Sequence, residues 1–116
     1  MKQPDDETRT GHIVDAGERI LRWTEGKSRA DLDADDQLQS AVAYQLQIIG
    51  EAASHLSEDF RRTYADIPWR RIIGMRHILV HAYMDVDLDL VWDVLAAHLT
   101  PLMDTLRPLV PPETEL

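Results

Sequence analysis

Hydrophobic residues recur along most of this chain at the three- and four-residue spacing that is typical of helices buried on one face. Between about Asp5 and Thr24 the spacing defines one apolar stripe, made of Ile13, Ala16, Gly17, Ile20, Trp23 and Thr24. Acidic residues at the start of this segment suit a helix N-terminus, and Gly26 supplies a stop. The pattern predicts a first helix over about residues 5–24.

A second long helix is predicted from about Asp36 to Ser57, after a short connector in which Ser28 is a candidate cap and Leu32 the anchor. Its inward face comprises Leu38, Ala41, Val42, Gln45, Ile49, Ala52, Ala53 and Leu56. Gln45 is the polar member of this row. Gly50 lowers helix propensity, and close approach of another helix explains it most simply. Glu51 lies off the stripe, either as a solvated residue or as a partner for an arginine.

A turn is predicted from Phe60 to Ile67, with Phe60 and Tyr64 over the core edge. A third helix then starts with Asp66 near the cap and Pro68 in the first turn, where a missing N–H is harmless. It is expected to end at about residues 82–84. Its predicted inward residues are Trp69, Ile72, Ile73, Leu79 and Val80.

The last helix is predicted to begin at Asp85 or Asp87 and to be kinked by Pro101, because proline interrupts the hydrogen-bond ladder. Its inward residues are Leu88, Val91, Trp92, Leu95, Leu99, Leu102 and Leu106. No alternating pattern typical of a strand occurs. The chain is therefore predicted to be all-α, an antiparallel four- to five-helix bundle with a kinked last helix. We expect one domain over residues 1–116, with its core at about 5–107 and a flexible tail at 108–116.

Composition excludes several classes of protein. The chain has 116 residues, the size of one domain, and contains no cysteine, which excludes disulfides, thiol nucleophiles and thiolate metal sites. The first residues lack the apolar core of a signal peptide, and no apolar run approaches membrane-spanning length. We therefore expect a cytoplasmic protein without membrane contact.

Charge is distributed unevenly. The formal net charge of −9 argues against a protein that coats nucleic acid non-specifically. Residues 61–76 nevertheless carry five arginines against one acid, Asp66, which gives this segment a net charge of 5 − 1 = +4. We call these residues the basic segment. Its arginines either pair with acidic neighbours on adjacent helices or remain available for an anionic ligand.

From the last residue of the basic segment onward, a permanent cation, two imidazoles and a phenol occur within eight residues, at Arg76, His77, His81 and Tyr83. On a straight α-helix Arg76 and Tyr83 lie nearly on one line, and His77 and His81 share the neighbouring face. Arg76 and His81 are five residues apart, roughly 140° around the axis. Either the helix distorts here, or a second surface such as a two-fold dimer completes the site.

These groups suit metal-independent cleavage of RNA. Attack of a ribose 2′-OH on the adjacent phosphate requires a base, a cation for the developing negative charge and an acid for the leaving 5′ oxygen. Histidine titrates in the range needed for both proton transfers, and arginine holds phosphate oxygens in a fixed orientation. His81, near a helix C-terminus, would be favoured in its protonated form by the helix dipole.

Other interpretations of these residues stay open. His77 and His81 have a spacing able to hold zinc, although no third ligand is evident. Tyr83 could be a core-edge residue with a bonded hydroxyl, and Arg76 could extend from the core to solvent along its aliphatic stem. The remaining histidines are isolated in sequence, which favours surface or packing roles for His12, His55 and His98.

Residues 76–83 match the pattern R-x-x-x-x-H-x-Y, and their sequence setting is more specific than the pattern alone. The matching segments are Ile48–Ala53, Ile67–Arg70, Gly74–Arg76, Asp85–Leu88 and Val91–Trp92. Together they resemble the HepT-like branch of the HEPN superfamily over residues 5–107. One departure is Ala82, where relatives often have glycine.

This resemblance implies the HEPN helical bundle and the toxin of a toxin–antitoxin pair, a homodimeric, metal-independent endoribonuclease that needs no cofactor. Arg76 and His81 would be catalytic, with His77 and Tyr83 in supporting roles and Arg70 and Arg71 as RNA contacts. The implied partner is a minimal nucleotidyltransferase antitoxin, which transfers AMP to Tyr83. Two alternatives are a non-catalytic subunit that binds nucleotide or substrate for a nucleotidyltransferase, and a structural dimerisation domain.

Overall fold

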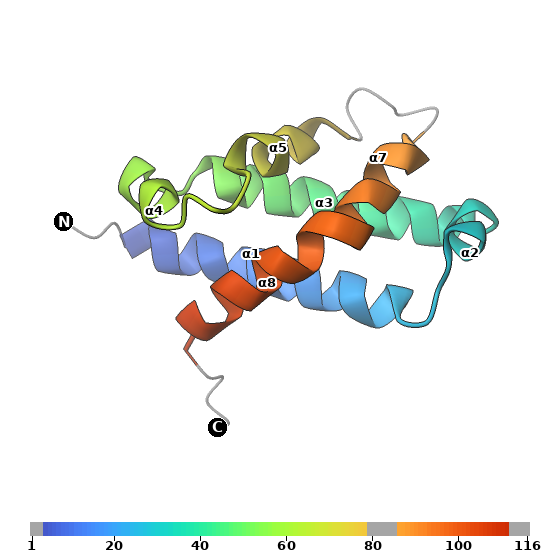
Figure 1. Ribbon diagram of the computed structural model, residues 1–116, viewed down its shortest axis with the longest axis horizontal. Helices are drawn as coiled ribbons and strands as arrows, with labels where there is room; N and C mark the ends of the chain where they lie inside the picture. Colours follow the sequence, from blue (N-terminus) through green and yellow to red (C-terminus); the bar gives the residue numbers. More distant parts are fainter. Residues whose placement is uncertain (1–3, 79–85, 112–116) are drawn as a thin grey trace.

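The fold was determined from a computed structural model that describes residues 4–78 and 86–111, and the regular structure within these ranges is helical throughout (Figure 1). The elements are α1 (Pro4–Thr24), α2 (Arg29–Asp33), α3 (Asp36–Ser54), α4 (Glu58–Thr63), α5 (Trp69–Gly74), η1 (Met75–His77), α7 (Leu88–Asp93), η2 (Val94–His98), α8 (Leu99–Leu106) and η3 (Arg107–Leu109). The all-α prediction is confirmed.

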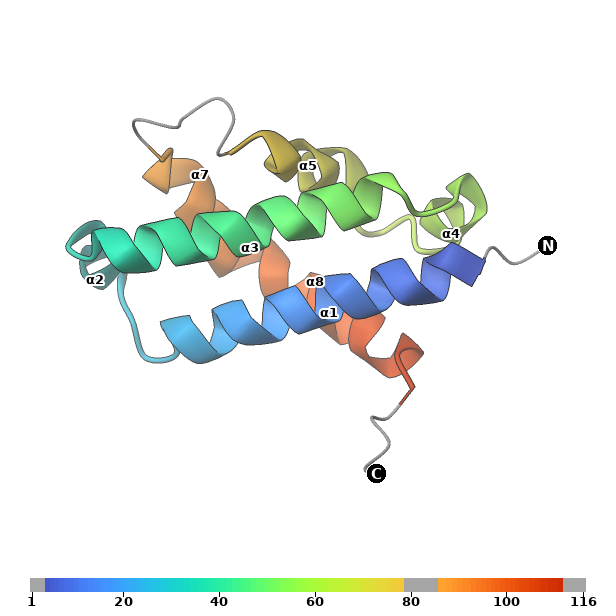
Figure 2. The ribbon, with the colours of Figure 1, turned by 180° about the vertical axis from the view of Figure 1, so that it is seen from behind.

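The two long helices, α1 and α3, lie side by side and run in opposite directions (Figures 1 and 2). The shorter α5 lies on the far side of α3 from α1, and α7 and α8 cross the long helices diagonally (Figure 1). Between these elements lies one apolar core, whose largest fully buried side chains include Ile13, Ile20, Leu46, Ile49, Ile72, Met75, Leu99, Leu102 and Leu106. This arrangement is the helical bundle that the sequence predicts.

The first connector follows the sequence signals closely. Gly26 has a φ of +72°, the left-handed conformation that ends a helix readily at glycine. Ser28 and Asp31 form a capping box at the start of α2, in which the Ser28 side chain accepts from the Asp31 amide at 3.2 Å. Leu32, 1% exposed, anchors α2 in the core. These predictions are confirmed.

The predicted end of the second long helix is wrong, because α3 stops at Ser54 and Ser57 instead caps a separate helix, α4. The Ser57 hydroxyl accepts from the Phe60 amide at 3.1 Å. Acids follow directly in the first turn and arginines close the last turn, which suits the helix dipole at both ends. The predicted turn at Phe60–Ile67 therefore contains a helix, although Phe60 and Tyr64 do pack on the core edge as expected.

Helix α5 begins later than predicted. Pro68 occupies the N-cap position rather than the first turn, and no side chain provides a capping hydrogen bond. Asp66 is exposed and does not cap the helix. The predicted inward residues Leu79 and Val80, and the candidate cap Asp85, lie outside the described residues.

The kink predicted at Pro101 takes the form of one π-helical turn, η2, just before α8. The Leu99 amide donates to the carbonyl of Val94, five residues earlier. Because a proline ring clashes with the carbonyl four residues before it, Pro101 disfavours the regular ladder at this point. The wider turn buries Val94 and Leu99, five apart, and leaves Leu95 half-buried where α-helical spacing predicts it inward.

The C-terminal boundary differs from the prediction in the same region. Residues Arg107–Leu109 continue α8 as a 3-10 turn, and Arg107 pairs with Glu18 of α1 through an Nε–Oε1 contact of 2.7 Å. Residues 108 and 109 are therefore part of the helical structure and not of a tail. No helix in the described ranges is both long and apolar enough to cross a membrane.

Candidate functional site

Arg76 and His77 lie in η1, where the chain tightens from α5 into a 3-10 turn. The amide of Ile78 donates to the Met75 carbonyl, three residues back, as this tighter turn requires. The helix therefore tightens at Arg76, and the two alternatives for bringing Arg76 and His81 to one target stay open. His81 and Tyr83 lie outside the described residues, so their relation to Arg76 stays a prediction.

Gly50 of α3 positions the backbone of Arg76. A Cβ built on Gly50 would lie 2.5 Å from the Arg76 amide nitrogen and 3.0 Å from the Ile72 carbonyl oxygen. Both are backbone atoms, so only glycine permits α5 and η1 to pack this closely on α3. The close approach expected at Gly50 is confirmed, and the helix that approaches carries Arg76.

The Arg76 side chain is half-buried, and its Nε donates a weak hydrogen bond to Nε2 of His77 at 3.4 Å. In this contact the guanidinium donates and Nε2 of His77 accepts. No carboxylate among the described residues pairs with Arg76. Its guanidinium therefore retains a positive charge that can bind a phosphate.

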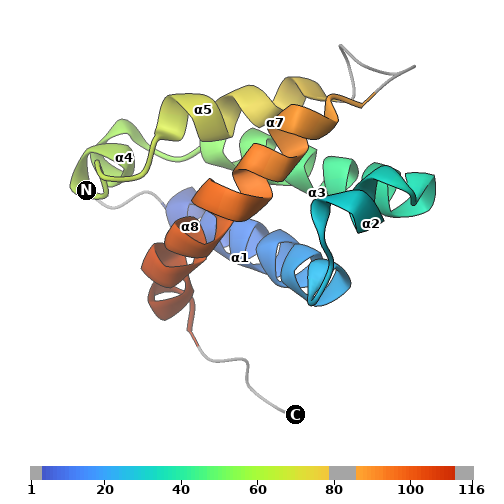
Figure 3. The same ribbon diagram turned by 45° about the vertical axis from the view of Figure 1, so that its right-hand side comes forward.

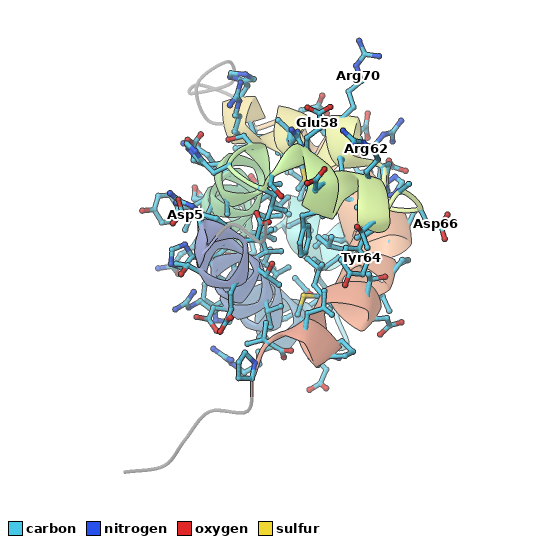
Figure 4. All side chains as sticks on the ribbon, turned by 90° about the vertical axis from the view of Figure 1, so that its left-hand side faces the viewer. Asp5, Glu58, Arg62, Tyr64, Asp66 and Arg70 are labelled. Carbon is cyan, nitrogen blue, oxygen red and sulfur yellow. The ribbon has the colours of Figure 1, made fainter. Side chains whose placement is uncertain are left out.

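The two predicted RNA contacts differ in their surroundings. Arg70 is exposed, points away from the body of the molecule (Figure 4) and forms no ion pair within the described ranges. Arg71 instead donates from Nη1 to Oδ2 of Asp93 on α7 at 2.8 Å. Arg62, elsewhere in the basic segment, pairs with Glu58 and Asp59 of its own helix. Pairing with an acidic residue of another helix thus holds for Arg71, Arg62 pairs within its own helix, and Arg70 is available to an anion.

Glu51 is exposed, and its Oε2 lies 3.0 Å from Nε2 of His55 one turn later on the same face. Of its two interpretations, the solvated residue is confirmed. In the part of the chain that the structure describes, no arginine pairs with it. His55 and His12 lie on the surface, as predicted.

His98 is half-buried, as a packing role predicts, but it is not isolated in the structure. Its Nε2 lies 3.3 Å from Nη1 of Arg71 and 3.5 Å from Oδ2 of Asp93. The π turn η2 creates this cluster, and its one sequence signal is Pro101, three residues after His98. Helical spacing alone does not place Asp93 and His98 together.

The rest of the described ranges offers a cavity but no metal site. No three His, Asp or Glu side chains gather there in a way that could hold a metal ion. A cavity of about 440 Å³ lies between α1, α4 and η3, and its walls include Asp6, Ser57, Phe60 and Leu109. None of the predicted site residues that the structure describes lines this cavity.

Comparison with known proteins gives a consistent family assignment. The family model described as Ribonuclease HepT-like matches residues 13–109. A probable ribonuclease HepT of Thermococcus cleftensis is 40% identical over 69% of this chain and 73% of its own length. An RNase candidate of Caldanaerobacter subterraneus subsp. tengcongensis is 30% identical over 88% and 91%, respectively.

A Methanocaldococcus jannaschii protein, named as a gamma-glutamylcyclotransferase and candidate RNase, is 38% identical over 80% of this chain, which spans only 42% of that relative. No solved structure gives a significant match. The family model covers more than half of the chain, and the helical bundle agrees with it. The chain therefore belongs to the HepT-like ribonuclease family.

Proposed function

We propose that this protein is the toxin of a toxin–antitoxin pair and cleaves RNA without a metal ion, using Arg76 and His81. The observation that carries the proposal is membership of the HepT-like ribonuclease family together with the pattern R-x-x-x-x-H-x-Y at residues 76–83. The geometry of Arg76 supports it, since its backbone is packed on Gly50 and its guanidinium lacks a carboxylate partner among the described residues.

In the proposed reaction the ribose 2′-OH attacks the adjacent phosphorus and the bond to the 5′ oxygen breaks. The products are a 2′,3′-cyclic phosphate and a 5′-hydroxyl end. Arg76 stabilises the negative charge that develops on the phosphoryl oxygens. His81 transfers a proton, and His77, whose Nε2 accepts from Arg76, has a supporting role. Arg70 binds the RNA backbone from the outer face of α5.

The proposed active form is a homodimer. Each copy offers a small number of basic side chains, and an RNA strand needs several phosphate contacts. A two-fold axis near η1 would double the arginines and histidines around one cleft.

The proposed antitoxin is a minimal nucleotidyltransferase that transfers AMP from ATP to Tyr83. The phenolic oxygen attacks the α-phosphorus, the bond to pyrophosphate breaks, and the phenolic proton is released to solvent. An adenylyl group so close in sequence to Arg76 would add negative charge that competes with RNA phosphate for the guanidinium.

The test is RNA cleavage in EDTA by the full chain, expressed without any nucleotidyltransferase. We expect the wild type to cleave and both Arg76→Ala and His81→Ala to lose roughly 10²- to 10⁴-fold in rate. His12→Ala, which changes an exposed histidine far from η1 in sequence, is the matched control and should retain full activity.

Two results would overturn the catalytic assignment. Wild-type activity that disappears in EDTA would indicate metal-dependent chemistry, and equal cleavage by all variants would indicate a contaminant. If the wild type binds nucleotide and cleaves no RNA, the non-catalytic subunit becomes the better interpretation.

Tyr83→Phe should cleave RNA and resist labelling by the nucleotidyltransferase with radioactive ATP.

A further inference from the structure

Arg71, Asp93 and His98 form a cluster that joins two parts of the bundle. Arg71 comes from α5, Asp93 is the last residue of α7, and His98 ends the π turn η2. Nη1 of Arg71 lies 2.8 Å from Oδ2 of Asp93 and 3.3 Å from Nε2 of His98. One guanidinium nitrogen therefore contacts both partners. Figure 3 shows α5 and α7 next to each other on this side of the molecule.

The π turn explains how the cluster arises. Asp93 and His98 are five residues apart, roughly 140° around a regular α-helix. A π-helical turn hydrogen-bonds residues five apart and so brings them to the same face. Nε2 of His98 and Oδ2 of Asp93 lie 3.5 Å apart as a result. The π turn therefore forms the face that receives Arg71 from α5.

The charges of the cluster argue against its use as a phosphate site. Asp93 neutralises Arg71 at close range, and an RNA phosphate that approached Arg71 would be repelled by the carboxylate. Arg70, the neighbouring residue, has no such partner in the described structure and is the better RNA contact. Arg71 therefore has a role within the protein.

The position of Arg71 defines that role. It lies five residues before Arg76, on α5, which continues without a break into η1. Gly50 of α3 fixes one side of this segment, and the cluster attaches it to α7 and η2. In sequence, α5 and α7 flank the residues that we propose to be catalytic. The cluster thus joins the element before these residues to the element after them.

We propose that Arg71, Asp93 and His98 are positioning residues that hold Arg76 in its cleavage geometry. The proposal rests on the proposed ribonuclease function. The side chains are partly solvated, with exposures of 53% for Arg71, 48% for Asp93 and 23% for His98. Exposed ion pairs of this kind contribute little to global stability. Their loss leaves the protein folded and allows η1 to shift.

The decisive experiment compares Asp93→Asn with Asp89→Asn in RNA cleavage by the full chain. Asp89, also on α7, is a matched control. Its Oδ1 forms an ion pair of the same length, 2.8 Å, but the partner is Arg29 of α2, which does not lead into η1. We expect Asp93→Asn to lower kcat by about tenfold with little change in KM, since small displacements of a catalytic group are costly. Asp89→Asn should leave both constants unchanged.

An RNA-binding role for Arg71 predicts the opposite result. Removing the carboxylate of Asp93 would then release Arg71, and KM would fall. Under our proposal Arg71→Gln should lower kcat as much as Asp93→Asn does. Arg71→Lys should retain more of kcat than Arg71→Gln, because a lysine can still form the ion pair. His98→Gln, which retains an acceptor for Arg71, should lose less activity than His98→Leu.

A second readout separates this proposal from the ribonuclease function itself. In the folded full chain, Asp93→Asn should shift the NMR resonance of the Arg76 amide and speed its hydrogen exchange, and Asp89→Asn should not. Those changes without RNA cleavage by the wild type would support the positioning role and refute the ribonuclease. An Arg76 amide that is unaffected by Asp93→Asn, or a lower KM in that variant, would overturn the positioning role.

Discussion

The α-carbon of Gly50 lies against the backbone of Arg76, so closely that a Cβ on Gly50 would be 2.5 Å from the Arg76 amide nitrogen and 3.1 Å from its α-carbon. Helix α3 thereby sets the position of the arginine that we propose to be catalytic. The atoms of Arg76 in this contact belong to its backbone. A change of side-chain rotamer at Arg76 therefore cannot relieve the clash with a larger residue at position 50. The geometry of the site thus depends on a residue far from it in sequence.

Gly50→Ala should destabilise the protein by about 1 to 3 kcal/mol, because overpacking against backbone outweighs the better helix propensity of alanine. Urea denaturation followed by circular dichroism measures the change. Gly11→Ala is the matched control in α1, where an added Cβ meets nothing within 4 Å. It should stabilise by about 0.5 to 1 kcal/mol. Equal effects of the two substitutions would show that propensity alone decides.

Gln45→Met should stabilise the fold by about 1 kcal/mol, because it removes a buried acceptor that lacks a hydrogen bond at nearly constant volume. Gln45 is 8% exposed, and its Oε1 has no partner in the described structure. Thermal unfolding provides the measurement. Gln37→Met, at an exposed position of the same helix, should change stability little. A less stable Gln45→Met protein would mean that the amide has a partner, such as a bound water.

Asp6→Ala should lower the free energy of unfolding by about 2 to 3 kcal/mol, because it removes hydrogen bonds to a charged group. Asp6, 5% exposed on α1, accepts from the Ser57 amide at 2.7 Å and from its hydroxyl at 2.6 Å. This carboxylate thereby attaches α1 to the cap of α4. Asp5→Ala, an exposed neighbour in the same first turn, should cost about 0.5 kcal/mol or less in chemical denaturation. Equal losses of stability in Asp6→Ala and Asp5→Ala would contradict the attachment of α1 to α4 through Asp6.

Asp31→Asn should destabilise the protein near neutral pH and have a diminishing effect in acid. The Ser28 backbone N–H, followed by its hydroxyl, lowers the pKa of Asp31. A lowered carboxyl pKa means that the folded state favours the ionised form. The stabilisation is therefore complete above the ordinary pKa of about 4 and is lost as pH falls from there through the lowered value. Urea unfolding of both proteins from neutral pH downward tests this, and a difference independent of pH would refute it.

Local signals in the sequence determined much of the fold. Helix periodicity, the Ser28 capping box and the left-handed Gly26 act within a few residues, so the first helix and connector are where the sequence predicts them. The Ser57 cap is equally local and was readable in the same way. The sequence nevertheless predicts a turn at Phe60–Ile67, because the six-residue α4 is too short to show a full apolar stripe.

Residue chemistry and helix propensity are properties of the chain alone, so the sequence predicts a functional role for Arg76 and a close helix approach at Gly50. No local signal predicts that Gly50 contacts Arg76, that Asp93 neutralises Arg71, or that His98 joins this ion pair. Each of these contacts depends on how separate helices pack against one another. A π turn at residues 94–98 also changes which side chains share a face, and regular helix spacing cannot anticipate it.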